Sequence, residues 1–138
     1  MIAHTLSSPG AVLLCVDDDN MTLAIMKLIL EKNGFSVHTA TDWSCAVDTF
    51  RENPIDLVVL DYEMPDMKGH EIAKRFRNLK PEVPIILHSS SSYIPEIAIK
   101  VTDALIPKGV ETCVLVATIS NLIMKSQTVR NSCHIRCA

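Results

Sequence analysis

The sequence contains no apolar run of the ~20 residues that a membrane-spanning helix requires. Its first ten residues have no Lys or Arg ahead of an apolar stretch, so the pattern of a secretory signal peptide is missing. A basic excess is missing too, because 13 Lys and Arg stand against 16 Asp and Glu and give a net charge of −3. These absences predict a cytoplasmic protein that neither inserts into membranes nor binds nucleic acid directly.

A disulfide framework is not indicated either. The five cysteines are an odd number, and Cys15, Cys45 and Cys113 lie inside apolar runs, which is typical of free thiols in a reducing compartment. The 138 residues, of which 48% are hydrophobic and 21% charged, are enough for one packed domain and leave little room for a second.

Short apolar runs alternate with longer segments of helical periodicity, and this pair of patterns occurs five times. Strands joined by crossover helices, with little polar alternation, form a parallel sheet that is covered on both faces. Right-handed crossovers then give a doubly wound (βα)5 fold of the α/β class. The predicted strands cover residues 12–16, 35–40, 55–60, 83–88 and 104–106, and the predicted helices cover residues 21–33, 44–52, 68–79, 94–101 and 110–124. We expect a flexible N-terminus over 1–10, the domain over 11–125 and a mobile tail over 126–138.

Residues that can carry chemistry follow the ends of four predicted strands. Asp17 and Asp18 follow the first strand and Asp61 follows the third, whereas Ser89 and Lys108 follow the fourth and fifth. Because ligands of such folds bind at the carboxyl ends of the strands, these side chains are expected to converge. Crowded carboxylates raise one another's pKa unless a cation lies among them, and a small set of hard oxygen ligands suits Mg²⁺ or Mn²⁺. A carboxylate beside such a metal can attack phosphorus and form an aspartyl phosphate.

Each of these residues also has an ordinary explanation when it is taken singly. An acidic triplet can cap the following helix, Asp61 can stabilise a turn before Pro65, Ser89 can bond its own backbone, and Lys108 can be a surface charge. Their joint position at strand ends favours a site.

Four stretches resemble the receiver domain of two-component response regulators, over residues 12–124. They are LCVDDDN at 14–20, DLVVLDYEMPDMKG at 56–69, PIILHSS at 84–90 and PK at 107–108. The resemblance implies a flavodoxin-like sheet with strand order 2-1-3-4-5. It also implies that Asp61 accepts a phosphoryl group from a histidine kinase or a histidine phosphotransfer protein. Mg²⁺ (or Mn²⁺) would be held by Asp18, Asp61 and the backbone carbonyl of Glu63, with Asp17 acting through water. By the same resemblance, Ser89 is the switching hydroxyl and Lys108 bridges to the phosphoryl group.

The sequence departs from the family pattern near its last strand. Gly109 follows the lysine where the family usually has proline, and Leu105 stands where the family commonly has an aromatic switch residue. The segment from Ser89 to Lys108 is also shorter than in familiar receivers of the chemotaxis type, which shortens the fourth helix. We therefore expect partner proteins to bind elsewhere than on the family's usual contact face around that helix.

A partner surface is therefore expected on the first and last helices. The first helix is assigned a core face of Met21, Ile25, Leu28 and Ile29, which leaves Leu23, Met26 and Leu30 as a second apolar stripe. The last helix has Val116 and Ile123 beyond an expected core set of Leu115, Ile119 and Leu122. We expect a downstream protein effector or a second copy to contact Leu23, Met26 and Leu30. With no further domain after Met124, the chain is expected to act as a stand-alone receiver.

The main alternative function is that of a phosphorylation-independent pseudo-receiver, a binding module. A small Mg²⁺-dependent phosphohydrolase would need an Asp two residues after its nucleophile, where this chain has Glu63. A flavin carrier would need a Ser-, Thr- and Gly-rich loop after the first strand, where three carboxylates would repel a phosphate. We expect no enzyme activity beyond the chain's own phosphorylation and dephosphorylation.

Overall fold

The computed structural model describes the backbone of residues 10–65 and 67–137, and the side chains of residues 10–65 and 67–129. Strands and helices alternate along this part of the chain, as the sequence predicted. The strands are β1 Val12–Val16, β2 Ser36–Ala40, β3 Leu57–Asp61, β4 Ile85–Ser89 and β5 Ala104–Pro107. The helices are α1 Asn20–Lys32, α2 Trp43–Glu52, α3 Gly69–Leu79, α4 Glu96–Lys100 and α5 Thr112–Cys137. The predicted flexible N-terminus over 1–10 lies almost wholly outside the described residues.

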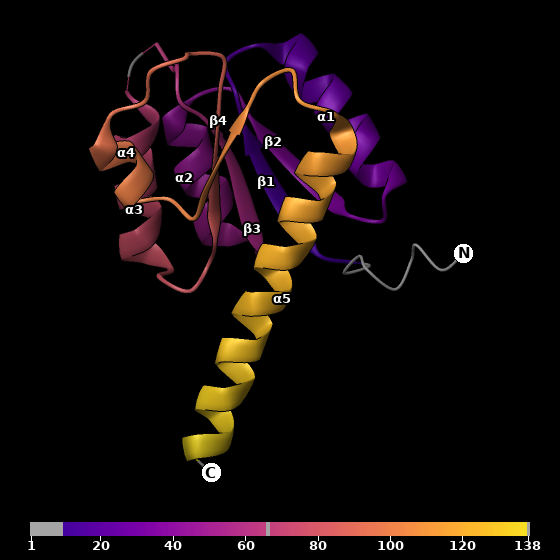
Figure 1. The fold of residues 1–138 in the computed structure, drawn as a ribbon, viewed down its shortest axis with the longest axis vertical. Coiled ribbons are helices and arrows are strands. Elements are labelled where there is room, and N and C mark those ends of the chain that lie inside the picture. The colour runs from indigo at the N-terminus through magenta and orange to yellow at the C-terminus, as the bar shows by residue number, and fades with distance from the viewer. Residues whose placement is uncertain (1–9, 66, 138) are drawn as a thin grey trace.

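The five strands form one parallel sheet in the order β2-β1-β3-β4-β5 (Figure 1). Helices α2, α3 and α4 pack on one face, around Phe50 and Phe76, whose ring centroids are 4.5 Å apart. Helices α1 and α5 cover the other face, around Leu30 and Ile119. The central strands β1 and β3 are buried on both sides, because alternate residues point to opposite faces and both sets are apolar up to Asp61 at the end of β3. The doubly wound α/β prediction and the strand order are confirmed.

The expected orientation of α1 is wrong. Leu23, Met26 and Leu30 lie in the core with 4%, 8% and 0% of their surface exposed, whereas Met21 and Ile25 are 68% and 51% exposed. The surface predicted to contact a partner is therefore the core face, and that prediction is also wrong. Both stripes of the helix are apolar, so composition could not separate them.

The N-cap of α1 defines where the helix begins. The side chain of Asp19 accepts hydrogen bonds from the backbone N–H of Met21 and from the hydroxyl of Thr22, at 3.1 and 2.8 Å. These contacts set where the first turn begins. The face that is buried is the one on which Leu23, Met26 and Leu30 pack against the sheet.

The last helix is longer than expected. It was predicted to end at Met124 but continues to Cys137, and its C-terminal part projects beyond the sheet (Figure 1). Residues 112–138 contain no Gly or Pro that would end a helix. Ile123, expected outside the core, is fully buried, while Val116 and Leu122 are partly buried against the same cluster. In the described part of the chain, no helix has both the length and the apolar character to cross a membrane.

Candidate functional site

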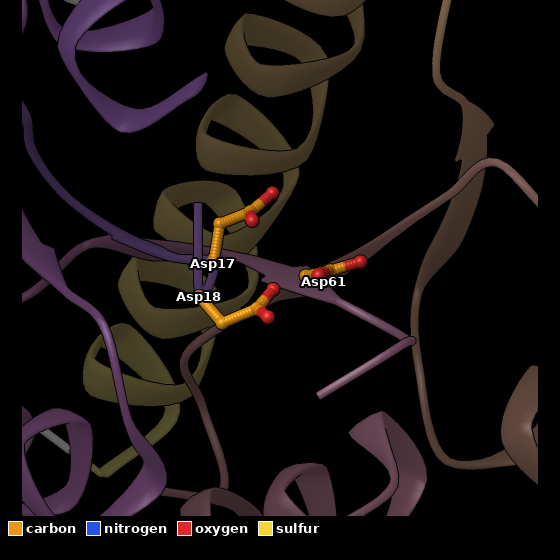
Figure 2. A group of neighbouring side chains, drawn as sticks. All are labelled: Asp17, Asp18 and Asp61. Atoms are coloured by element: carbon orange, nitrogen blue, oxygen red, sulfur yellow. The ribbon is translucent and has the colours of Figure 1, made fainter. Parts of the chain in front are cut away.

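Three carboxylates meet at the C-terminal edge of the sheet. Asp61 is the last residue of β3, and Asp17 and Asp18 follow β1, which pairs with β3. Figure 2 shows the three side chains gathered at this edge. Each offers an oxygen atom, and these oxygens lie within 4.8 Å of one another. Asp17 and Asp61 are each 2% exposed, whereas Asp18 is open to solvent.

Backbone amides fix two of these carboxylates. Oδ1 of Asp17 accepts a hydrogen bond from the N–H of Asp19 at 2.9 Å, and Oδ1 of Asp61 accepts one from the N–H of Glu63 at 3.2 Å. Both are Asx turns, in which an Asp side chain accepts a hydrogen bond from the backbone N–H two residues later. The turn after Asp61 also places the Glu63 backbone directly beside the Asp61 carboxylate.

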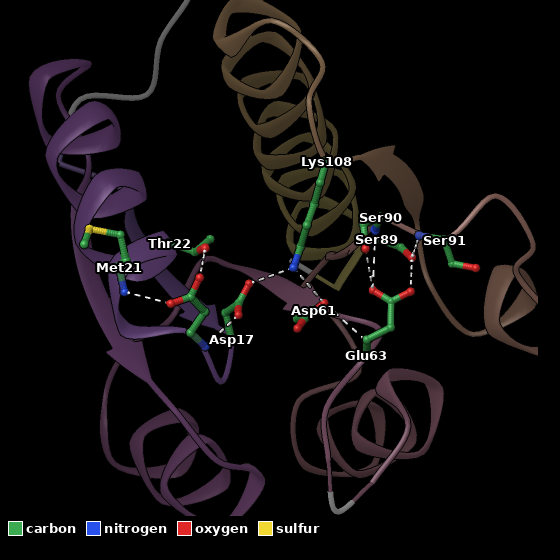
Figure 3. Close-up of polar contacts among 10 residues, drawn as sticks. Asp17, Met21, Thr22, Asp61, Glu63, Ser89, Ser90, Ser91 and Lys108 are labelled. Atoms are coloured by element: carbon green, nitrogen blue, oxygen red, sulfur yellow. Dashed lines mark hydrogen bonds and ion pairs between the residues drawn. The ribbon is translucent and has the colours of Figure 1, made fainter.

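The ammonium of Lys108 joins the two buried carboxylates (Figure 3). Its Nζ lies 3.0 Å from Oδ2 of Asp17 and 3.1 Å from Oδ1 of Asp61. The backbone N–H of Lys108 donates to the carbonyl of Ser89 at 2.7 Å, which anchors the end of β5 to β4. Gly109, which follows, has a φ of +98°, a conformation that proline cannot adopt. With Gly109 in this conformation, the turn after β5 places the Lys108 ammonium in the site.

The charges in this cluster perturb one another. Burial raises the pKa of Asp61, the nearby charge of Asp17 raises it further, and Lys108 opposes both. Burial alone would lower the pKa of Lys108, but its hydrogen bonds to Asp17 and Asp61 and their charges raise it above its ordinary value. Lys108 therefore stays cationic between two carboxylates that would otherwise repel each other.

Ser89 lies at the same edge but bonds a different group. It is 1% exposed, its hydroxyl donates to Oε2 of Glu63 at 2.9 Å, and its Oγ accepts from the N–H of Ser91 at 3.0 Å (Figure 3). The other carboxylate oxygen of Glu63 lies 3.4 Å from both the N and the Oγ of Ser90. Sequence reasoning assigned Glu63 only a backbone role and missed this side-chain contact. Spacing from Asp61 does not reveal which way a turn side chain points.

A close contact explains the glycine of the 56–69 stretch. A Cβ on Gly69 would lie 2.8 Å from Cα of Tyr62 and 3.0 Å from the carbonyl oxygen of Asp61. The N–H of Gly69 donates to the carbonyl of Tyr62 at 3.1 Å. Helix α3 therefore begins against the backbone that carries Asp61, and a side chain at this position would displace that backbone.

The donor set fits a hard divalent cation. Asp17, Asp18 and Asp61 offer only carboxylate oxygens, and the exposed Asp18 leaves one side of the cluster open to water. Mg²⁺ prefers such sites, with one or two carboxylates and several retained waters. A carboxylate beside a cation and an ammonium can also act as a nucleophile toward phosphorus.

Comparisons with known proteins point to one family. The family model described as response regulator receiver domain matches residues 13–120. The autoinducer 1 sensor kinase/phosphatase LuxN of Vibrio campbellii is 30% identical over 87 residues, which are 63% of this chain and 10% of LuxN. The chain thus spans only a small part of that relative.

Two solved structures of response regulator proteins are matched over nearly their whole length. A receiver domain protein (CheY-like) from Methanospirillum hungatei has a TM-score of 0.81 and 25% identity, covering 86% of this chain and 98% of that one. The response regulator TrrA from Thermotoga maritima, solved in complex with Mg²⁺-BeF, has a TM-score of 0.77 and 29% identity, covering 81% of this chain and 98% of that one.

Proposed function

Because the chain belongs to the response regulator receiver domain family, we propose that Asp61 accepts a phosphoryl group from a histidine kinase or a histidine phosphotransfer protein. The observation that carries this proposal is the position of the Asp61 carboxylate, within 4.8 Å of Asp17 and Asp18 oxygens and 3.1 Å from the Lys108 ammonium. The phosphorylated chain would then act on a downstream protein effector.

The proposed reaction is one nucleophilic displacement. A carboxylate oxygen of Asp61 attacks the phosphorus of a phosphohistidine, the P–N bond breaks, and the imidazole leaves with the electron pair and takes up a proton. Lys108 is cationic and contacts Asp61, so it is placed to bind the oxygens of the transferred group as a point charge. Mg²⁺ or Mn²⁺, held by Asp18, Asp61 and the Glu63 carbonyl with Asp17 acting through water, would neutralise charge on the phosphoryl oxygens.

The phosphoryl donor would dock on α1. This helix begins directly after the Asp17–Asp19 turn, and Met21, Ile25 and Leu28 present an apolar stripe that is more than half exposed at each residue. A protein that delivers a phosphoryl group to Asp61 must lie against this edge of the sheet, and the stripe offers apolar surface to bury there.

Acetyl phosphate with Mg²⁺, followed by intact mass measurement, tests the proposal. The wild type should gain one phosphate, and D61N should gain none. D48N, which changes an exposed carboxylate of α2, should gain one phosphate like the wild type. A wild-type mass that does not change would instead support the phosphorylation-independent binding module.

A further inference from the structure

The hydroxyl of Ser89 already donates a hydrogen bond to the side chain of Glu63. Ser89 has one hydroxyl proton, and it points to Oε2 of Glu63 at 2.9 Å. The bond is buried at the Ser89 end, and its acceptor is a carboxylate. Hydrogen bonds to an ionised acceptor are roughly twice as strong as neutral ones.

A phosphoryl group on Asp61 would compete for the same proton. Glu63 is tied to Asp61 through its own backbone N–H, so both possible acceptors belong to one short turn. One proton cannot serve the Glu63 carboxylate and a phosphoryl oxygen together. The Ser89–Glu63 bond must therefore break before Ser89 can bind the phosphoryl group.

We propose that Glu63 is a positioning residue that withholds the Ser89 hydroxyl from the phosphoryl group and so weakens the switch. This inference rests on the proposed function of Asp61. It assigns the side chain of Glu63 a role that is separate from its backbone carbonyl.

The same hydroxyl also holds the loop after β4. The N–H of Ser91 donates to Oγ of Ser89, while the hydroxyl of Ser91 donates to the carbonyl of Tyr93 and accepts from its N–H. This loop borders a groove of about 480 Å³ lined by Tyr93, Leu105 and other residues of 89–108. If the Ser89 side chain turns away from Glu63, its Oγ moves relative to the Ser91 amide that it accepts from. The hydrogen bond that holds the loop after β4 therefore changes as well.

A double-mutant cycle on Glu63 and Ser89 tests the proposal, with beryllofluoride and Mg²⁺ as the stand-in for the phosphoryl group. Its affinity is measured by calorimetry for the wild type, E63Q, S89A and E63Q/S89A. E63Q should bind beryllofluoride about fivefold more tightly than the wild type, because a neutral amide holds the hydroxyl less strongly. In the S89A background, the effect of E63Q should fall below about twofold.

The cycle separates hydrogen bonding from simple charge repulsion. If E63Q improves affinity as much without the Ser89 hydroxyl as with it, or has no effect in either background, the proposal is wrong. E111Q, which removes an exposed carboxylate from another loop, controls for net charge and should leave affinity unchanged. In the wild type, the Ser91 amide resonance should shift when beryllofluoride saturates. A wild type that neither binds beryllofluoride nor takes up phosphate would refute the proposed function itself.

Discussion

The ammonium of Lys108 lies 3.1 Å from Oδ1 of Asp61, across the carboxyl ends of β3 and β5. Even with this cation in contact, the pKa of Asp61 is raised, because burial and the charge of Asp17 outweigh the attraction of Lys108. The ionised carboxylate is thus held in the fold at a cost in stability, which is common where chemistry needs a charge.

D61N should be more stable than the wild type at neutral pH without divalent cations. A carboxyl with a raised pKa binds its proton more tightly in the folded chain, so wild-type stability falls as pH rises from the ordinary value of 3.8 through the folded pKa. D61N lacks this loss. Urea unfolding in EDTA should give a difference that is largest at pH 7 and shrinks toward pH 4. A less stable D61N at pH 7 would mean that the Lys108 contact dominates.

Mg²⁺ should stabilise the wild type through the acidic cluster. At about ten times its Kd, a bound ion adds ~1.4 kcal/mol, which raises Tm by about 5 °C in a domain of this size. D18A should abolish the shift, and because Asp18 is exposed, it should do so without loss of packing. E52A, at an exposed position of α2, should keep the shift. An equal shift in D18A, or none in the wild type at millimolar Mg²⁺, would contradict the assignment.

The two faces of α1 should respond differently to the same truncation. L23A removes a side chain that is 4% exposed and should cost ~2–4 kcal/mol in the free energy of unfolding. L28A removes one that is 58% exposed and should cost less than ~0.5 kcal/mol. Urea denaturation of both variants checks this. A larger loss of stability in L28A than in L23A would instead support the orientation of α1 that was predicted from the sequence.

G69A should destabilise the domain by ~1–3 kcal/mol, since the new Cβ would meet Tyr62 Cα at 2.8 Å. At an unhindered helical position the same change would stabilise the chain by up to ~1 kcal/mol, so the sign is diagnostic. Phosphate uptake from acetyl phosphate should fall as well, because the Asp61 backbone must shift. A higher urea midpoint for G69A would show that the backbone accommodates a Cβ at this position, which would contradict the proposed clash.

Sheet geometry made the fold and the location of the site predictable. Parallel strands bring their carboxyl ends to one edge, so Asp17, Asp61 and Lys108 could be expected together before any contact was seen. Apart from the end of α5, the predicted element boundaries lie within two residues of those observed.

The remaining features depend on contacts that the pattern does not encode. The orientation of α1 depends on the packing of Leu23, Met26 and Leu30 against the sheet, and the sequence pattern does not encode it because both stripes of the helix are apolar. The partnership of Glu63 with Ser89 depends on the direction of a turn side chain, and no periodicity reports that direction. The length of α5 could have been anticipated from the absence of Gly and Pro after Met124.

Direct location of the acyl phosphate tests the central claim. After treatment with acetyl phosphate and Mg²⁺, borohydride reduces a phosphorylated aspartate to homoserine, and peptide mass spectrometry then identifies its position. We predict homoserine at position 61, none when Mg²⁺ is removed by EDTA, and none in D61N. Homoserine at position 17 or 18, or none anywhere in the wild type, would contradict the assignment of Asp61 as the phosphoacceptor.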